Sequence, residues 1–335
     1  MAGLTREFGI DLGTMNIVLA EGNRVLLQEP TVVAILSEEL KMVEWGQVAK
    51  DMIGRVPDSI EVVRPIQNGV IAEYEITENL LGFILKKVTG SMLLFRPRIL
   101  LTVPYGVTSV ERRAVHEAGL GAGSRDVYLI EQPLAAALGV NLPISSPSGN
   151  MIISLGGGTN QVAVLSMNGV VTAETSKTGG IRFDEAIISY IRRKFGVIVD
   201  QSTAEQLKIR IGCAVPQDQQ LTMEVQGQDQ VTQLPKPVTL TTHDIVDALQ
   251  EPLSELVATA RRVLEKTPPG LISDIMDRGV ALCGGGSQLK GIDKFLTKSL
   301  GIPAYLVDNP LTCTAEGAAK ALGMREALRR NLLPT

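Results

Sequence analysis

Two glycine-containing loops stand out in the sequence because they follow the same plan. Residues 9–14 read GIDLGT and residues 154–159 read SLGGGT. Each loop lies between two apolar runs and ends in a threonine, which predicts a tight turn between two strands. Glycine lets the backbone approach a ligand closely and point its N–H groups at it, an arrangement that suits phosphate oxygens. The pair indicates a phosphate-binding hairpin that occurs twice.

A third glycine cluster lies near the C-terminal end of the chain. It consists of Gly284, Gly285, Gly286 and Ser287, and it follows a strand-like apolar run at 280–283. A helical pattern begins after it, so the amides of the cluster would lie at a helix N-terminus, where anions bind well. One such loop would be weak evidence for a ligand. Two matching hairpins and a third glycine turn predict two similar domains that hold one nucleotide between them.

Length and composition place the chain among globular proteins. Its 335 residues suffice for two domains with cores of their own. With 44% hydrophobic and 20% charged residues it does not resemble a disordered chain. The net charge is -4 and no long basic run is present, so nucleic acid is not an expected partner. The pattern GxxxxGK[ST] is missing, which excludes a P-loop as the phosphate-binding element.

The cysteines, the histidines and the hydropathy pattern point to a cytoplasmic protein. Cys213, Cys283 and Cys313 stand singly, without CxxC spacing, and are expected to be free thiols in a reducing compartment. The two histidines, His116 and His243, are too few for a metal cluster. No charged segment followed by an apolar stretch opens the chain, and no run approaches the length of a membrane span.

Strands and helices alternate in mixed order along both halves, which predicts an α/β protein. A capping box at 108–111 predicts the start of one helix, and Thr77 is expected to cap an earlier one. Residues 214–241 alternate apolar and polar around Gly227, as a solvent-facing hairpin would. One long helix is expected from about 244 to 266. Because a meander of strands opens each half, two related domains are favoured over a single Rossmann sheet.

The chain resembles the MreB family of bacterial actin homologues, within the superfamily of actin, sugar-kinase and heat-shock-chaperone ATPases. The matching stretches are 9–14, 46–55, 64–72, 107–118, 128–137, 203–208 and 284–291, and they extend over essentially the whole chain in one order. The resemblance implies an α/β actin-like ATPase fold with a nucleotide cleft between two related domains. The first domain would comprise residues 1–145, with a small inserted subdomain at about 33–65, and a C-terminal helix at about 315–335 would complete it. The second would comprise residues 146–314, with an insert at about 182–243.

The resemblance further implies ATP and magnesium in the cleft. Asp11 would act on the metal through water, which suits a hard cation that keeps much of its hydration shell; the alternative is that Asp11 only forms the turn. The phosphates would contact Gly13, Thr14, Met15 and Asn16 on one side and Gly156, Gly157, Gly158 and Thr159 on the other. Adenosine would be recognised by Gly179, Gly180, Glu205, Lys208 and the turn at 284–287. Glu205 and Lys208 share one helical face, and a surface ion pair is the alternative reading.

Two positions depart from the family pattern. Aspartate usually stands where this chain has Ser154, and MreB proteins usually carry glutamate where it has Gln132, although actin has glutamine there. Serine keeps hydrogen bonding but removes a charge that helps to organise the magnesium waters. A neutral amide can position water but is a poor proton acceptor. With Asp11, Gln132 and Ser154 as the catalytic group, we expect slow hydrolysis, unless the changes are compensated locally and turnover is ordinary.

An apolar run stands where a polar turn is expected. It consists of Met92, Leu93, Leu94 and Phe95, between Thr89-Gly90-Ser91 and Arg96-Pro97-Arg98. An exposed apolar loop with cationic neighbours suits shallow insertion into an anionic bilayer, and the MreB family is similar in binding membrane through a hydrophobic loop of this subdomain. The alternative is that these residues begin the buried strand that follows.

The expected function is that of an ATP-binding cytoskeletal protein that forms homopolymeric filaments on the inner face of the cytoplasmic membrane. The resemblance implies a role in guiding cell-wall synthesis and rod shape, with membrane proteins of the cell-elongation machinery as partners. One alternative is a chaperone-type ATPase, for which a client-binding domain is missing from the 335 residues. The other is a small-molecule kinase, which would need a base carboxylate beside an acceptor pocket.

Overall fold

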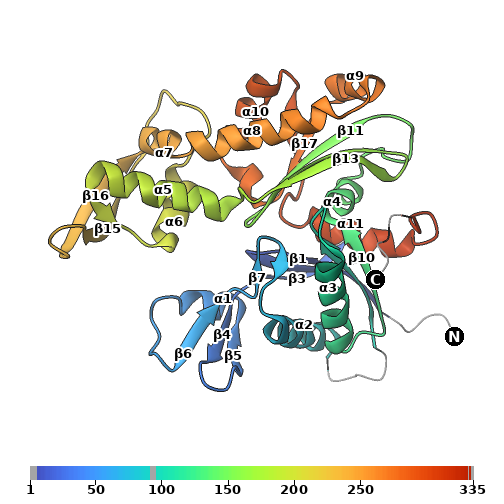
Figure 1. Ribbon diagram of the computed structural model, residues 1–335, viewed down its shortest axis with the longest axis horizontal. Coiled ribbons are helices and arrows are strands. Elements are labelled where there is room, and N and C mark those ends of the chain that lie inside the picture. The colour runs from blue at the N-terminus through green and yellow to red at the C-terminus, as the bar shows by residue number, and fades with distance from the viewer. Residues whose placement is uncertain (1–5, 91–95, 331, 333–335) are drawn as a thin grey trace.

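The first half of the chain builds a five-stranded sheet (Figure 1). The structure, a computed structural model, describes residues 6–90, 96–330 and 332. The strands are β1 (Glu7–Leu12), β2 (Asn16–Glu21), β3 (Arg24–Pro30), β9 (Arg98–Val103) and β10 (Asp126–Glu131). They lie in the order β10-β9-β1-β2-β3. Strands β1, β2 and β3 are antiparallel neighbours, whereas β9 is parallel to both β1 and β10.

The second half repeats this sheet strand for strand. Its strands are β11 (Asn150–Leu155), β12 (Asn160–Ser166), β13 (Gly169–Ser176), β17 (Val280–Cys283) and β18 (Ala304–Leu306). Their order is β13-β12-β11-β17-β18, again with three antiparallel strands followed by two parallel ones. The duplication that the two glycine loops predict therefore extends to the whole framework.

Helices cover both faces of each sheet, which explains why the central strands are almost continuously apolar. Helices α2 (Tyr74–Thr89) and α3 (Ser109–Gly121) pack on the outer face of the first sheet. On the second sheet, α8 (Gln250–Glu265), α9 (Pro269–Arg278) and α10 (Ile292–Leu300) do the same. Between the two sheets lie α4 (Gln132–Gly139) and α11 (Cys313–Gly323), whose core includes residues of both sheets.

The two helices between the sheets approach one another through glycines. A Cβ on Gly317 of α11 would overlap the carbonyl oxygen of Ala135 in α4, and a Cβ on Gly139 would overlap that of Cys313. The C-terminal helix expected at about 315–335 is α11, and the described residues 324–330 that follow it form turns. This close packing ties the end of the chain to the first half.

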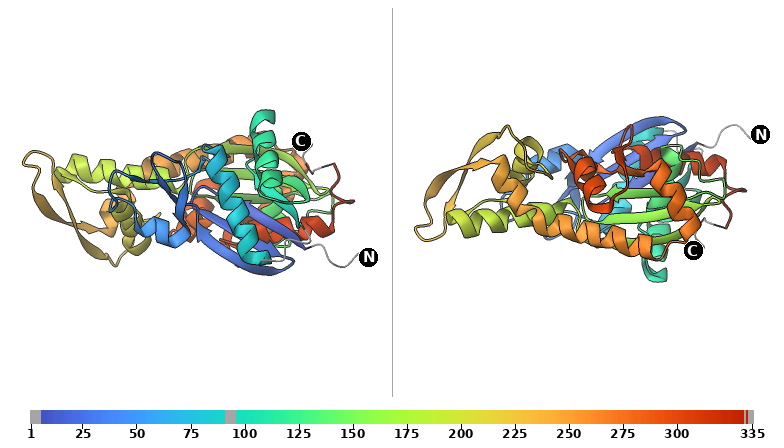
Figure 2. Two further views of the ribbon diagram at one scale, coloured as in Figure 1. Left: turned by 90° about the horizontal axis from the view of Figure 1, so that it is seen from below. Right: turned by 90° about the horizontal axis from the view of Figure 1, so that it is seen from above.

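Each half carries a smaller sheet. In the first half, β4 (Val33–Leu36), β5 (Met42–Trp45) and β6 (Ile60–Val63) form three strands beside α1 (Gly46–Asp51). In the second half, β14 (Val197–Ile198), β15 (Thr222–Asp229) and β16 (Pro235–Thr241) form three strands beside α5 (Gly180–Phe195) and α6 (Gln201–Ile211). Figure 2 shows that the β15–β16 hairpin projects at one end of the molecule.

The predicted hairpin is present, but its turn is not at Gly227. The chain reverses at 230–234, where the Asp229 carboxylate accepts hydrogen bonds from the N–H groups of Val231 and Thr232. Gly227 lies inside β15 opposite Lys236. A Cβ there would lie 2.4 Å from a methyl group of Val197. The glycine therefore permits close strand packing, while the aspartate sets the turn.

Two helix boundaries also differ from expectation. The long helix expected at 244–266 is two helices, α7 (Thr242–Ala248) and α8, which meet at Leu249. Thr77 does not cap α2, because the helix begins at Tyr74 and the Thr77 hydroxyl donates to the carbonyl of Glu73. Such back-bonding within a helix competes with a capping role. The capping box of Thr108 and Glu111 at the start of α3 is confirmed.

The apolar run Met92, Leu93, Leu94 and Phe95 lies outside the described residues. Helix α2 ends at Thr89, and β9 begins at Arg98. Among the helices that the structure describes, none combines the length and the apolar character needed to cross a membrane.

Candidate nucleotide-binding cleft

A cavity of about 470 Å³ lies between the two halves, within the size range of ligand pockets. Both glycine hairpins and the third glycine turn line it. From the predicted site the lining includes Asp11, Gly13, Thr14, Met15, Asn16, Gln132, Ser154, Gly156, Gly157, Gly158, Thr159, Gly180, Glu205, Lys208, Gly284, Gly285 and Gly286. Residues that are far apart in the sequence thus meet in one cleft, because the glycine hairpin of each sheet lies at the side of that sheet that faces the other half.

The two hairpins have the same backbone geometry. The N–H of Gly13 donates to the carbonyl of Asn16 at 3.2 Å, and the N–H of Gly156 donates to that of Thr159 at 2.9 Å. In both, a Cβ on the glycine would lie 2.6 Å from the accepting oxygen. The same glycine is therefore needed in each hairpin for the same steric reason.

The hairpins also touch one another across the cleft. A Cβ on Gly157 would overlap the Met15 side chain, and one on Gly158 would lie 3.0 Å from the Cα of Asn68. The hydroxyl of Thr14 accepts a hydrogen bond from the N–H of Gly69 at 2.9 Å. The glycines leave no space for side chains of their own at this approach, so the main-chain N–H groups of the loops remain available to a phosphate.

Asp11 lies at the point where three parallel strands end. Thr102, near the end of β9, and Gln132, directly after β10, both donate to its Oδ1 atom, at 2.6 Å and 3.1 Å. Burial raises the pKa of the Asp11 carboxyl, and these two hydrogen bonds oppose the shift. Because both donors converge on Oδ1, the second oxygen is left for a cation or its water. Two members of the predicted catalytic group are therefore in direct contact.

Ser154, the third member of the predicted catalytic group, lies in the lining near the end of β11. Its neighbours across the sheet are Gln161 of β12 and Cys283 of β17. Gln161 is also in the lining, is 2% exposed, and donates through Nε2 to Oε1 of Gln132. Nothing in the sequence reasoning pointed to Gln161. Only the pairing of β11 with β12 places it beside the loop.

The residues around Asp11 fit a hydrated magnesium ion. Mg²⁺ keeps several waters in proteins and usually takes one or two carboxylates together with substrate phosphates. In the described part of the chain, no group of three or more His, Cys, Asp or Glu side chains could hold a metal by itself. An ion here would therefore rely on Asp11, on water and on the phosphates, whose charge it would neutralise.

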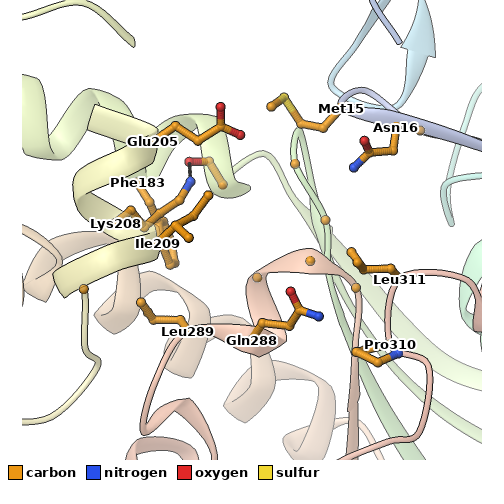
Figure 3. Close-up of a pocket in the computed structure, with 18 of the residues that line it drawn as sticks. Met15, Asn16, Phe183, Glu205, Lys208, Ile209, Gln288, Leu289, Pro310 and Leu311 are labelled. Atoms are coloured by element: carbon orange, nitrogen blue, oxygen red, sulfur yellow. Dashed lines mark hydrogen bonds between the residues drawn. The ribbon is translucent and has the colours of Figure 1, made fainter. Parts of the chain in front are cut away.

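The predicted adenosine contacts lie on the opposite wall, as Figure 3 shows. Glu205 and Lys208 extend from α6 into the pocket. They do not pair with each other in a surface ion pair. Glu205 binds Lys50 of the first half at 3.0 Å, and Lys208 lies 2.6 Å from Asp184. The Lys50–Glu205 contact joins the two halves beside the cleft, which both residues line.

Apolar side chains that were not predicted from the sequence also line this part of the cleft. In Figure 3, Phe183, Ile209 and Leu289 lie on the same side as Lys208, and Leu311 lies across the space from them. The side chain of Ile209 is 72% exposed, although such residues are usually buried. Apolar side chains around such a space suit the faces of a purine ring. The sequence offered no signal for these contacts, because neighbouring positions of a helix do not share a face.

Two residues of the predicted site, Gly179 and Ser287, lie behind the residues that line the cavity. The backbone at Gly179 packs under the second hairpin, and the N–H of Gly180 donates to the carbonyl of Gly156 at 2.9 Å. The Ser287 hydroxyl donates to the carbonyl of Gly284 at 2.6 Å, and the residue is 3% exposed. Gly179 and Ser287 therefore support the loops from behind.

Asp184, the partner of Lys208, is a buried carboxyl beside the cleft. Burial raises its pKa to about 6, although the ammonium of Lys208 opposes the shift. Because this pKa lies above the ordinary value, the folded state gains stability from Asp184 as the pH falls through 6. Relative to the Asp184→Asn variant, we expect the wild-type free energy of unfolding to rise by about 1 kcal/mol between about pH 7.5 and about pH 5. Urea unfolding at both pH values measures this, and a difference that does not change with pH would contradict it.

The family follows from a comparison over nearly the whole chain. A family model described as MreB/Mbl protein matches residues 5–330. The chain belongs to the MreB/Mbl family. Cell shape-determining protein MreB of Escherichia coli K12 is 44% identical over 326 residues, which is 96% of this chain and 94% of that protein. Cell shape-determining protein Mbl of Bacillus subtilis is 38% identical over 329 residues, with 98% and 99% covered.

Solved structures confirm the predicted actin-like fold of this MreB/Mbl chain. The crystal structure of MreB5 of Spiroplasma citri bound to AMPPNP matches with a TM-score of 0.92 at 31% identity, over 98% of this chain and 99% of that one. The same protein bound to ADP gives 0.91, with 98% of each chain covered. MamK in a double helical filament gives 0.80 at 16% identity, over 95% of this chain and 98% of that one, which supports the fold alone.

Proposed function

We propose that this chain is a bacterial actin-like cytoskeletal protein that binds ATP between its two halves and assembles into filaments that determine cell shape. The observation that carries the proposal is the cleft, to which each half contributes a glycine hairpin with the same backbone hydrogen bond. Relatives named as cell shape-determining proteins and the nucleotide-bound MreB5 structures support it. The predicted site residues and the domain limits, at residues 1–145 with 315–335 and at 146–314, are part of the proposal.

Nucleotide binding would promote assembly by changing how the two halves lie relative to each other. A ligand that touches both halves favours the arrangement in which they lie close together. The Met15–Gly157 packing and the Lys50–Glu205 ion pair already join the halves at two places along the cleft. The closed arrangement would then present matched surfaces to the next copy of the chain.

Hydrolysis is proposed to be slow, with magnesium held at Asp11. Gln132 offers an amide in place of a carboxylate beside the phosphate loops, and an amide accepts protons poorly. Ser154 supplies a hydroxyl, not a charge, at the end of β11. Binding of ATP would therefore persist long enough to support assembly before turnover.

Sedimentation of the purified chain with and without ATP–magnesium tests this function. Filaments that pellet only with nucleotide support it. A chaperone-type ATPase or a small-molecule kinase would bind ATP and stay in the supernatant at every nucleotide concentration. That outcome would reject the cytoskeletal function but would leave the cleft as the proposed nucleotide site.

We further propose that the apolar run at 92–95 anchors the filaments to the inner face of the cytoplasmic membrane, where they would meet the membrane proteins of cell elongation. The support is its sequence: four large apolar residues next to Arg96 and Arg98. Full burial of one such side chain is worth about 1.5–3 kcal/mol, so a monomer that inserts a few of them in part would bind weakly. A filament repeats the loop and binds through the sum of these contacts.

Changing Leu94 and Phe95 together to serine should abolish co-sedimentation with anionic liposomes. ATP binding and assembly in solution should remain, because neither requires an apolar loop. The matched control changes Leu40 and Val43, exposed apolar residues of the same half, to serine, and it should still pellet with lipid. Undiminished lipid binding by the loop variant would show that the anchor lies elsewhere.

A further inference from the structure

The two halves contact one another on both sides of the cavity, and the two sets of contacts differ in kind. On one side, α4 and α11 pack into a shared apolar core, so closely that a Cβ on Gly317 would overlap the carbonyl oxygen of Ala135. On the other side, Nζ of Lys50 on α1 lies 3.0 Å from Oε2 of Glu205 on α6. Figure 1 shows α4 and α11 on one side of the space between the halves and α1 and α6 on the other. The cavity lies between these two sets of contacts, because Thr314 of α11 and Lys50 both line it.

A cleft that opens to release a ligand opens more easily at the side of the ion pair. Separating α4 from α11 would break close packing along both helices and the dispersion contacts of their interface. The side chains of Lys50 and Glu205 are 31% and 21% exposed, so water can replace each partner as the two move apart. The α4–α11 side is therefore the hinge of such an opening, and the halves separate where the ion pair lies.

Arg64 brings a second cation of the first half to this side. It lies directly after β6, and its Nη1 atom is buried without a hydrogen-bond partner among the described residues. Burial lowers the pKa of the Arg64 guanidinium, and the carboxylates of Glu205 and Asp184 oppose that shift. Both carboxylates belong to the second half. Arg64 therefore acts across the cleft as a positive charge, and its Nη1 atom makes no hydrogen bond that would require an arginine.

The second half supplies the opposite charges. Asp184 of α5 is 1% exposed, and its Oδ1 atom lies 2.6 Å from Nζ of Lys208, which also donates to the carbonyl of Gly180 at 3.0 Å. Lys208 belongs to the same half as Asp184 and neutralises part of its charge, so Glu205 is the main partner of the two cations of the first half. Attraction between unlike charges thus favours the arrangement in which the halves lie close together.

We propose that Lys50 and Arg64 of the first half, together with Glu205 and Asp184 of the second, form an electrostatic latch that holds the halves together and sets the rate at which a bound nucleotide leaves. The inference rests on the proposed function, because the ligand that the latch retains is the nucleotide of the same cleft. It assigns a role in nucleotide retention to Lys50 and Arg64, neither of which belongs to the predicted phosphate or adenosine contacts.

Lys50→Met and Arg64→Met each remove one cation of the latch and keep a long side chain. We expect each to accelerate the release of a fluorescent ATP analogue about fivefold, the effect of losing one partly exposed ion pair. Stopped-flow mixing of the loaded protein with excess unlabelled ATP and magnesium measures the release. Lys41→Met and Arg55→Met are the matched controls, because both residues are exposed and lie in the same insert of the first half. Neither control should change the rate.

Arg64→Lys separates the charge of Arg64 from the shape of its side chain. Arginine and lysine differ most where the planar guanidinium makes paired hydrogen bonds, so release from this variant should stay within about twofold of the wild type. A residue that only packed would lose its role in the lysine and the methionine variants alike. Raising the ionic strength should accelerate release from the wild type and have little effect on the Lys50→Met/Arg64→Met double variant, because salt screens partly exposed charges.

The Glu205→Gln background tests whether Lys50 acts through its partner. Glu205 is itself a predicted adenosine contact, so its replacement is expected to change release on its own. The decisive quantity is the further effect of Lys50→Met, which should disappear once the carboxylate is gone, since the energies of two residues in contact are not additive. A further acceleration as large as in the wild-type background would overturn the inference.

Thermal unfolding identifies the variants that are folded, and Lys50→Met decides the matter if Arg64→Met does not fold, because Lys50 is a partly exposed residue. Release at the wild-type rate from folded Lys50→Met would overturn the inference, and so would an equal acceleration by the two controls. A wild-type chain that does not bind the analogue would instead overturn the proposed function.

Discussion

Replacing Asp11 with alanine should lower the magnesium-dependent affinity for ATP by about 10- to 100-fold, the range in which ligand-sphere changes act on metal binding. In the described lining the carboxylates are Asp11 and Glu205, and Glu205 lies at the adenosine end, paired with Lys50. Removing Asp11 therefore takes the last fixed negative charge from the phosphate end. Nucleotide affinity with magnesium and with a chelator measures the effect directly.

The matched control is Asp11→Asn, which keeps an oxygen to accept from Thr102 and Gln132. Its affinity for ATP should lose its dependence on magnesium, as in the alanine variant. Its unfolding temperature should stay close to that of the wild type. This comparison separates the charge from the two hydrogen bonds. ATP–magnesium binding that is unchanged in both variants would remove Asp11 from the metal site.

Ser154→Asp combined with Gln132→Glu should raise phosphate release by about 10- to 100-fold without weakening nucleotide binding. A glutamate at 132 would still accept from Nε2 of Gln161. It would also stand beside Asp11, and a nearby like charge raises the pKa of one carboxyl of such a pair. That shift brings a general base closer to neutral pH, and the aspartate at 154 restores a charge for the magnesium waters.

The two single variants show which position limits turnover. Gln132→Glu alone should account for most of the gain, because it supplies the proton acceptor, and Ser154→Asp alone should act chiefly through magnesium affinity. Phosphate release under single-turnover conditions is the measurement. A wild-type rate that already matches the double variant would show that the missing carboxylates do not limit this protein.

The parts of the site that could be predicted from sequence are those whose chemistry is local. Gly13 and Gly156 could be recognised because a four-residue turn with a backbone hydrogen bond tolerates no Cβ, whatever the rest of the fold does. The duplication of the hairpins then predicted two related halves, and the two sheets have the same strand order. The role of Asp11 was expected from the resemblance to the MreB family, and the residue lies in β1, two positions before Gly13.

The parts that could not be predicted depend on contacts between distant segments. Gln161 and Lys50 look like ordinary polar residues of a strand and a helix, and only the meeting of the two halves places one against Gln132 and the other against Glu205. The break between α7 and α8 at Leu249 has no glycine or proline to mark it. The turn at 230–234 was missed because Gly227, the obvious turn residue, serves strand packing instead.

The contacts of the residues predicted to bind adenosine could likewise be predicted only in part. Glu205 and Lys208 could be placed on one helical face from their spacing, but their partners could not. Glu205 pairs with Lys50, and Lys208 pairs with Asp184. These two ion pairs could not be predicted from the sequence, because each depends on a partner from another segment.

Electron microscopy of the purified chain on anionic lipid, with ATP–magnesium, with ADP and without nucleotide, shows whether nucleotide in the cleft between the two halves drives assembly on a membrane. We expect filaments on the lipid surface with ATP and few or none with ADP or without nucleotide. Filaments of equal number and length in all three conditions would contradict it, because assembly would then not depend on the cleft.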